Sequence, residues 1–166
     1  KSANLAEQFL TSVHGTSTAV FSTAAQQAEH VFRDVVTHLN AQSDGQALFS
    51  GTKALGLSIP NIAALLTDLR NDTSVATDNT SLKTAIDDWF APVTGKFDTY
   101  LPNATDEKVR FALSNTSGIQ NDVTADASAF RKVLKSAALV LLSVERNFTI
   151  PDIKSALQTS AEDLLS

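Results

Sequence analysis

The chain of 166 residues contains no cysteine, which excludes disulfide bridges and metal sites built on thiolates. Its longest purely apolar run, residues 137–142, is far too short to span a bilayer. Thirteen basic residues are scattered along a chain of formal net charge −5. The sequence therefore lacks the basic stripe expected of a protein that binds nucleic acid or an anionic membrane. The length favours one domain with a hydrophobic core.

Motifs that carry catalytic chemistry are missing too. Gly45 and Gly51 lack the lysine and hydroxyl spacing of a phosphate-binding loop. No Gly-x-Ser-x-Gly elbow is present, and a cysteine nucleophile is absent. The three histidines, His14, His30 and His38, all lie in the first helical segment, so a triad would need partners brought in by packing. We therefore expect no enzymatic activity, no catalytic residue and no cofactor.

One group of side chains has the spacing of metal ligands. His30, Asp34 and His38 are four residues apart, so they share one face of a helix. Two histidines and a carboxylate are a zinc-binding set in principle, but no fourth ligand is evident. A solvated polar face with local charge pairs, such as Glu29 with Arg33, explains the same spacing. We expect no metal site, and a small helical enzyme or metalloprotein stays a minor alternative.

Residues 1–42 have the pattern of one very long amphipathic helix. Gly15 costs about 1 kcal/mol relative to alanine inside a helix, and the neighbouring Thr16–Thr18 favours other conformations. Because tertiary packing often overrides such preferences, we predict one continuous helix. The apolar positions recur in steps of three, four and seven: Leu5, Phe9, Val13, Val20, Phe21, Ala24, Ala28, Val31, Phe32, Val35 and Leu39.

A turn and a short strand are predicted over residues 43–54. Gly45 suits the left-handed geometry that ends helices and tight turns, and a short apolar run follows it. The residues expected to set the turn or to anchor the segment are Asp44, Gly45, Leu48, Phe49, Ser50, Gly51 and Thr52.

Residues 55–107 are expected to form a helical insertion. Pro60 and Asn61 start one helix, and Thr80 or Ser81 caps the next, which Pro92 ends. The apolar stripes are expected at Ile62, Leu65, Leu66 and Leu69 in the first of these helices and at Leu82, Ala85, Ile86, Trp89 and Phe90 in the second. Residues 95–102 are expected to be irregular or briefly extended. Aromatic residues gather here without basic neighbours, so we interpret them as a core cluster rather than a ligand box or base-stacking platform: Trp89, Phe90, Phe97 and Tyr100.

Residues 108–125 switch to an alternating pattern that predicts a β-hairpin. Residues 127–166 then return to helical spacing, with one strongly apolar helix and a last helix that starts near Thr149 and Pro151. The chain begins without methionine inside a helical pattern, and the last helical pattern still runs at its end. We therefore expect it to be a piece of a longer protein.

A long helix that leads into Asp-Gly-x-x-Leu-Phe-Ser-Gly-Thr-Lys resembles the flagellin superfamily of bacteria. Within that family it is most similar to the hook-associated proteins, which join hook to filament. The Asp-Val-Thr-Ala-Asp turn at residues 122–126, before a helix that opens with Phe130 and Arg131, is similar as well. Ala47 departs from the family, where an aromatic residue is usual, and residues 55–101 carry little family signal. The matching residues are Asp44, Gly45, Leu48, Phe49, Ser50, Gly51, Thr52 and Lys53.

The resemblance implies a mainly α fold, an elongated bundle of long helices with a small β-hairpin in one rod-like domain over residues 1–166. It also implies that the N- and C-terminal rod helices pack together. The expected function is a structural, self-assembling subunit that is exported through the flagellar secretion apparatus and lies outside the cell. Its partners would be itself, flagellin, the hook-side junction protein and an export chaperone, with no nucleic acid, membrane or small-molecule substrate.

Two alternatives stay open beside the metalloprotein. The nearest is the filament flagellin, which shares the rod architecture. The other belongs to a different class, a helical-bundle sensor or ligand-binding domain, which an enclosed polar pocket inside the bundle would favour.

Overall fold

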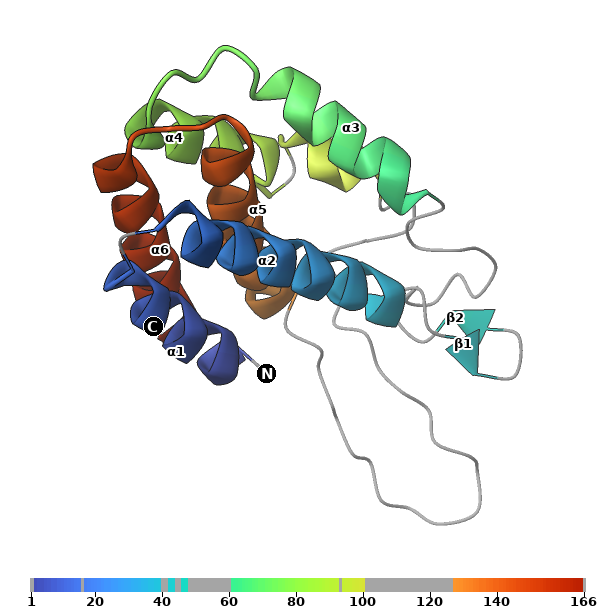
Figure 1. Ribbon diagram of the computed structural model, residues 1–166. Coiled ribbons are helices and arrows are strands. Elements are labelled where there is room, and N and C mark those ends of the chain that lie inside the picture. Colours follow the sequence, from blue (N-terminus) through green and yellow to red (C-terminus); the bar gives the residue numbers. More distant parts are fainter. Residues whose placement is uncertain are drawn as a thin grey trace.

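The chain is mainly α-helical (Figure 1). The computed structural model describes residues 2–15, 17–39, 42–43, 46–47, 61–92, 94–100 and 127–165. None of the helices in these ranges combines the length and apolar character that a membrane crossing requires. The elements are α1 (Ser2–Val13), α2 (Thr18–Leu39), β1 (Gln42–Ser43), β2 (Gln46–Ala47), α3 (Ile62–Asp72), α4 (Asn79–Trp89), the 3₁₀ helix η1 (Lys96–Tyr100), α5 (Ala127–Glu145) and α6 (Ile150–Leu165).

The first helical segment is broken, so the prediction of one continuous helix over residues 1–42 is wrong. α1 ends at Val13, where the amide of Gly15 donates to the carbonyl of Ser12 at 2.9 Å, and α2 begins at Thr18. A Cβ atom on Gly15 would lie 2.7 Å from Cγ1 of Val20, so the turn closes too tightly for a side chain. Here the local preferences prevail because the break lets each half pack on a different helix.

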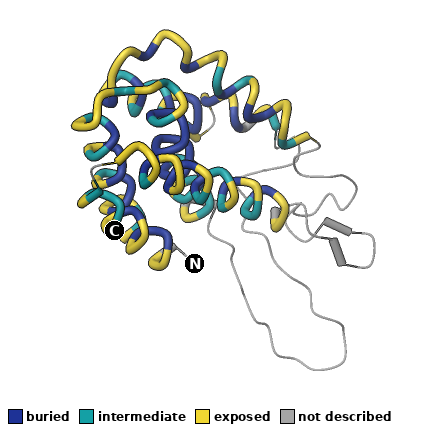
Figure 2. Tube along the Cα trace, in the orientation of Figure 1, coloured by how far each residue is buried: buried dark blue, intermediate teal, exposed yellow. Residues whose placement is uncertain are grey.

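α5 is the centre of the described bundle. All eight residues from Ser136 to Ser143 are buried, and the centre of the bundle is dark blue in Figure 2. α2, α4 and α6 all pack against α5. A helix that is apolar on every side is stable only when it is enclosed in this way.

The helices near the two ends of the chain pair in a nested order. α1 packs against α6, and α2 packs against α5. The outermost helices therefore lie together, and so do the next two, while α5 and α6 also contact each other. The predicted apolar faces are largely confirmed: Leu5, Phe9, Phe21, Ala24, Ala28, Phe32, Leu134, Ala137, Ala138, Leu141, Leu142, Ile153, Leu157 and Ala161 are buried.

α3 and α4 bury the predicted stripes; α4 packs against α5, and α3 packs against α4. Asn61 caps α3 by accepting a hydrogen bond from the amide of Ala64. The predicted cap of α4 is wrong: Asp78 is the N-cap, and its carboxylate and Ser81 bond reciprocally to each other's backbone amides. A carboxylate satisfies the first free amides of the helix better than a hydroxyl because its charge also suits the helix dipole.

The aromatic cluster is core, as predicted. Trp89, Phe90 and Phe97 are all at most 5% exposed, and the Phe90 and Phe97 ring centroids are 4.9 Å apart. The segment expected to be irregular or extended forms η1. Gly95 makes this tight path possible, because a Cβ atom there would meet the carbonyl oxygen of Trp89 at 2.5 Å.

A two-residue antiparallel ladder follows α2, with Gln42 opposite Ala47 and Ser43 opposite Gln46. The hairpin predicted over residues 108–125 lies outside the described residues. The turn and anchor set also lies outside them: Asp44, Gly45, Leu48, Phe49, Ser50, Gly51 and Thr52.

Candidate functional site

The paired α1 and α6 are the first candidate for a functional surface. The buried face of α1 consists of Leu5, Ala6 and Phe9. The buried side of α6, which packs against both α1 and α5, is rich in small residues, since Ala156, Ser160 and Ala161 are fully buried beside the larger Ile153 and Leu157. Small side chains let two helices approach closely, so this contact depends on packing rather than on charge.

Polar links across the terminal helices are few in the described chain. Oγ of Ser160 donates to the carbonyl of Ser136 at 3.1 Å and so ties α6 to α5. Nδ2 of Asn79 donates to Oγ of Ser155 at 3.0 Å and ties α4 to α6. The outward faces stay mostly polar, although Leu10 and Leu165 are exposed.

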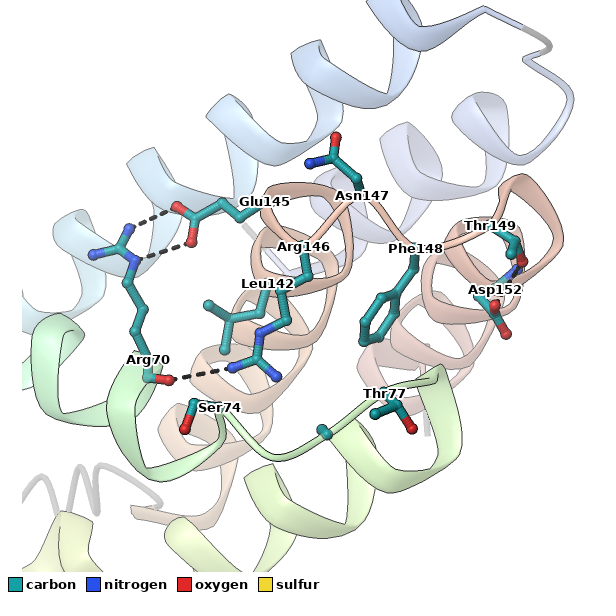
Figure 3. A pocket seen from close by; sticks show the side chains of 11 residues that line it. Arg70, Ser74, Thr77, Leu142, Glu145, Arg146, Asn147, Phe148, Thr149 and Asp152 are labelled. Atoms are coloured by element: carbon teal, nitrogen blue, oxygen red, sulfur yellow. Dashed lines mark hydrogen bonds and ion pairs between the residues drawn. The ribbon is translucent and has the colours of Figure 1, made fainter.

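A second candidate is an open pocket of about 670 Å³ where the α3–α4 connection meets the α5–α6 turn (Figure 3). Its walls contain both apolar and polar side chains. Leu142, Ala76 and Phe148 supply apolar surface, and hydroxyl groups and charged side chains supply the rest. The polar lining residues are Arg70, Ser74, Thr77, Glu145, Arg146, Asn147, Thr149 and Asp152.

The two arginines of this pocket differ in their partners. Arg70 makes a two-point ion pair with Glu145, with Nε and Nη2 at 2.9 and 2.7 Å from the carboxylate oxygens, and this hydrogen bond raises the pKa of Arg70. Arg146 donates instead to neutral acceptors, the carbonyl and hydroxyl oxygens of Thr73, both at 2.6 Å, and the carbonyl of Arg70 at 3.3 Å. Burial lowers the pKa of Arg146, and the Glu145 charge opposes this only in part.

The backbone turn at the end of α5 positions two side chains that line the pocket. Asn147 has a φ of 52°, the left-handed conformation of a helix C-cap. The amide of Phe148 donates back to the carbonyl of Ser143 at 3.1 Å, which closes the cap. This turn places Arg146 and Phe148 on the same side of the chain, where both side chains point toward the α3–α4 connection (Figure 3).

A third polar group surrounds the aromatic core. Asp72 of α3 accepts from Nε1 of Trp89 at 2.9 Å and from Nζ of Lys96 at 2.8 Å. The hydrogen bond from Lys96, helped by the weaker effect of the bond from Trp89, holds the pKa of Asp72 below its usual range, although burial acts in the opposite direction. The hydroxyl of Tyr100 donates to Asp68, and burial together with this bond raises the pKa of Tyr100 to about 12. The arrangement locks a phenol and an indole in place and leaves neither poised to react.

Asp87 is a bridge between α4 and α5. Its carboxylate accepts from Lys83 at 2.8 Å and from Lys135 at 3.0 Å. Burial alone would raise the pKa of Asp87, but the two lysines outweigh it and lower the pKa. The guanidinium of Arg131 lies 5.2 Å from the centre of the Phe97 ring and donates to the Phe90 carbonyl. These contacts fasten the aromatic corner to the central helix.

The metal-like spacing on α2 is an exposed face. His30 and Asp34 are 3.7 Å apart, with 71% and 46% of their side chains exposed, and His38 bonds to the carbonyl of Asp34. Arg33 pairs with Glu29 at 2.7 Å, the local pair that the spacing suggested. In the described ranges, no three histidine or acidic side chains come together as a metal site.

The residues of the pocket are not marked by any local spacing in the sequence. Arg70 and Glu145 are 75 positions apart, and Arg146 and Thr73 are 73 apart, so no local spacing marks them. One signal was present, because an asparagine followed by an apolar residue at a helix end is typical of the left-handed cap.

Comparison with known proteins finds no counterpart: no protein-family model, curated protein or solved structure matches this chain.

Proposed function

We propose that this protein is a structural subunit of the bacterial flagellum, most like flagellar hook-associated protein 3, which joins hook to filament. One observation carries the proposal beyond the resemblance of residues 44–53. The outermost described helices, α1 and α6, pack together, and α2 and α5 pack together inside them. This pairing supports the proposal because the resemblance implies that N- and C-terminal rod helices pack together.

The work of such a subunit is mechanical. A pair of helices formed by both ends of the chain transmits load between neighbouring subunits without chemistry, and the apolar, closely packed contact of α1 with α6 suits that task. The break at Gly15 departs from the continuous rod helix of the family. It changes the direction of α1 relative to α2 and leaves the nested pairing in place.

The ligand-binding alternative receives less support. An enclosed polar pocket inside the bundle would favour it, whereas the pocket at Arg146 is open and is formed at a junction of connections. Filament flagellin stays the nearest alternative, since it shares the rod architecture.

The test is a clean deletion of the full-length gene in a strain with one copy, followed by electron microscopy of the cells and an assay of the medium for flagellin. We expect hooks without filaments and flagellin shed into the medium. Bare hooks with no flagellin in the medium would instead identify the filament subunit. Normal filaments and normal swimming would overturn the flagellar proposal.

A matched pair of complementing genes tests the paired helices. Phe9 is fully buried, whereas its neighbour Leu10 is 39% exposed. We expect Phe9→Asp to leave the deletion strain without filaments, because it places a charge inside the α1–α6 contact. Leu10→Asp should restore them. Filaments restored equally by both genes would contradict the role of this contact.

A further inference from the structure

The pocket at Arg146 contains a guanidinium that, in the described chain, is hydrogen-bonded to neutral oxygens and to no carboxylate. No carboxylate in the described residues pairs with Arg146, whose three hydrogen bonds all go to neutral oxygens. A guanidinium carries five N–H groups, so two stay available in a side chain that is already held in one position.

The two carboxylates nearby are engaged elsewhere. Glu145 is bound at two points by Arg70. Asp152 accepts from the hydroxyl of Thr149 in the first turn of α6, where the helix dipole also favours negative charge. The positive side of the pocket is therefore Arg146 itself.

Apolar side chains gather at the rim of the same pocket. The described chain has four exposed large hydrophobic residues, and two of them, Val75 at 83% and Ile150 at 47%, directly adjoin lining residues. The ring of Phe148 lines the pocket and points toward the α3–α4 connection (Figure 3). Exposed apolar groups around a polar centre are typical of a protein contact surface rather than of a small-molecule site.

We infer that this pocket docks a segment of another protein that presents a carboxylate side chain beside an aliphatic one. The carboxylate would pair with Arg146, and the aliphatic group would lie against Phe148 and between Val75 and Ile150. A guanidinium fixed in advance loses little entropy on forming such a pair. The inference does not depend on a flagellar function.

The direct test uses the 166-residue chain, labelled with ¹⁵N, and two blocked dipeptides. Acetyl-Leu-Glu-amide should give saturable amide shifts at Ser74, Thr77 and Phe148. Acetyl-Leu-Gln-amide has the same shape without the charge and should bind about tenfold more weakly. Equal binding of the two dipeptides, or no saturable shifts with either, would overturn the inference.

Variants at the rim keep the test independent of folding, because Val75 is 83% exposed. We expect Val75→Asp to weaken binding of the Glu dipeptide severalfold and Val75→Lys to preserve or strengthen it. Leu10→Asp on α1 adds the same charge far from the pocket and should have no effect. If Val75→Asp and Val75→Lys behave alike, electrostatic recognition at Arg146 is wrong.

Discussion

The nested terminal helices and the aromatic corner of α3, α4 and η1 are held together by different means. In the terminal pair, small buried residues such as Ala6, Ala156 and Ala161 let helices meet closely with few polar links. In the corner, three large buried rings are surrounded by bonds to Asp68, Asp72 and Lys96. The contact between the terminal helices depends on how closely the helices approach each other, and the aromatic corner depends on large side chains and charged groups.

The two regions therefore stabilise the fold in different ways. Small residues between the larger ones of a helix contact let two helices approach closely over several turns. A corner made by large rings is a local anchor. The two regions should therefore respond to opposite kinds of substitution, since removal of volume harms the corner and addition of volume harms the pair.

The largest effect is expected from Phe97→Ala. The ring is 2% exposed and contacts both Trp89 and Phe90, so its loss should lower the free energy of unfolding by about 3–5 kcal/mol. Urea unfolding followed by circular dichroism measures the change, and Val75→Ala should stay within about 0.5 kcal/mol of the parent as a control. A loss for Phe97→Ala as small as the control's would show that the corner is not the anchor.

Ala156→Leu should have the next largest effect. Its side chain is fully buried in α6, and the added atoms would force apart closely packed helices, at a cost of about 1–3 kcal/mol. Ala63→Leu makes the same change on the exposed side of α3 and should cost about 0.5 kcal/mol or less. Equal unfolding midpoints for the two variants would contradict the close-approach account.

The smallest effect concerns pH. Because Lys96 and Trp89 hold the pKa of Asp72 below its unfolded value of about 3.9, its contribution to stability is complete above that value and is lost as pH falls through the folded pKa. Asp72→Asn should therefore reduce the drop in urea midpoint between pH 5 and pH 3, roughly the titration range of a carboxylate. Glu162→Gln on α6 serves as the control, and identical pH profiles for Asp72→Asn and the parent would count against the Asp72 bonds.

The helices α3, α4, α5 and α6 could be predicted from local pattern, because a helix face repeats every three or four residues. Leu65, Leu66 and Leu69 on α3 illustrate this, since their spacing alone marked the buried stripe. The division of the first segment into α1 and α2 and the 3₁₀ helix η1 were not predicted. The cap of α4 was missed by two or three positions, because Asp, Thr and Ser are all capable caps and the choice depends on the path of the preceding loop.

The candidate site was much harder to foresee. Thr73 has the composition of a polar loop residue, yet it is fully buried because Arg146 reaches it from α5. The break at Gly15 is a related case. The sequence showed a weak point there, but the packing of α1 on α6 and of α2 on α5 decided that the helix breaks.

The sequence by itself therefore determined the helical class, most of the buried faces and the aromatic core, because these depend on side-chain periodicity and on the transfer of apolar surface from water. Which helices pair, where the first segment turns, and that Arg146 lies near Phe148 with no carboxylate of the described residues bound to it are features of the folded chain. These features arise from contacts between residues far apart in the chain, and no local sequence pattern predicts the free energy of such contacts.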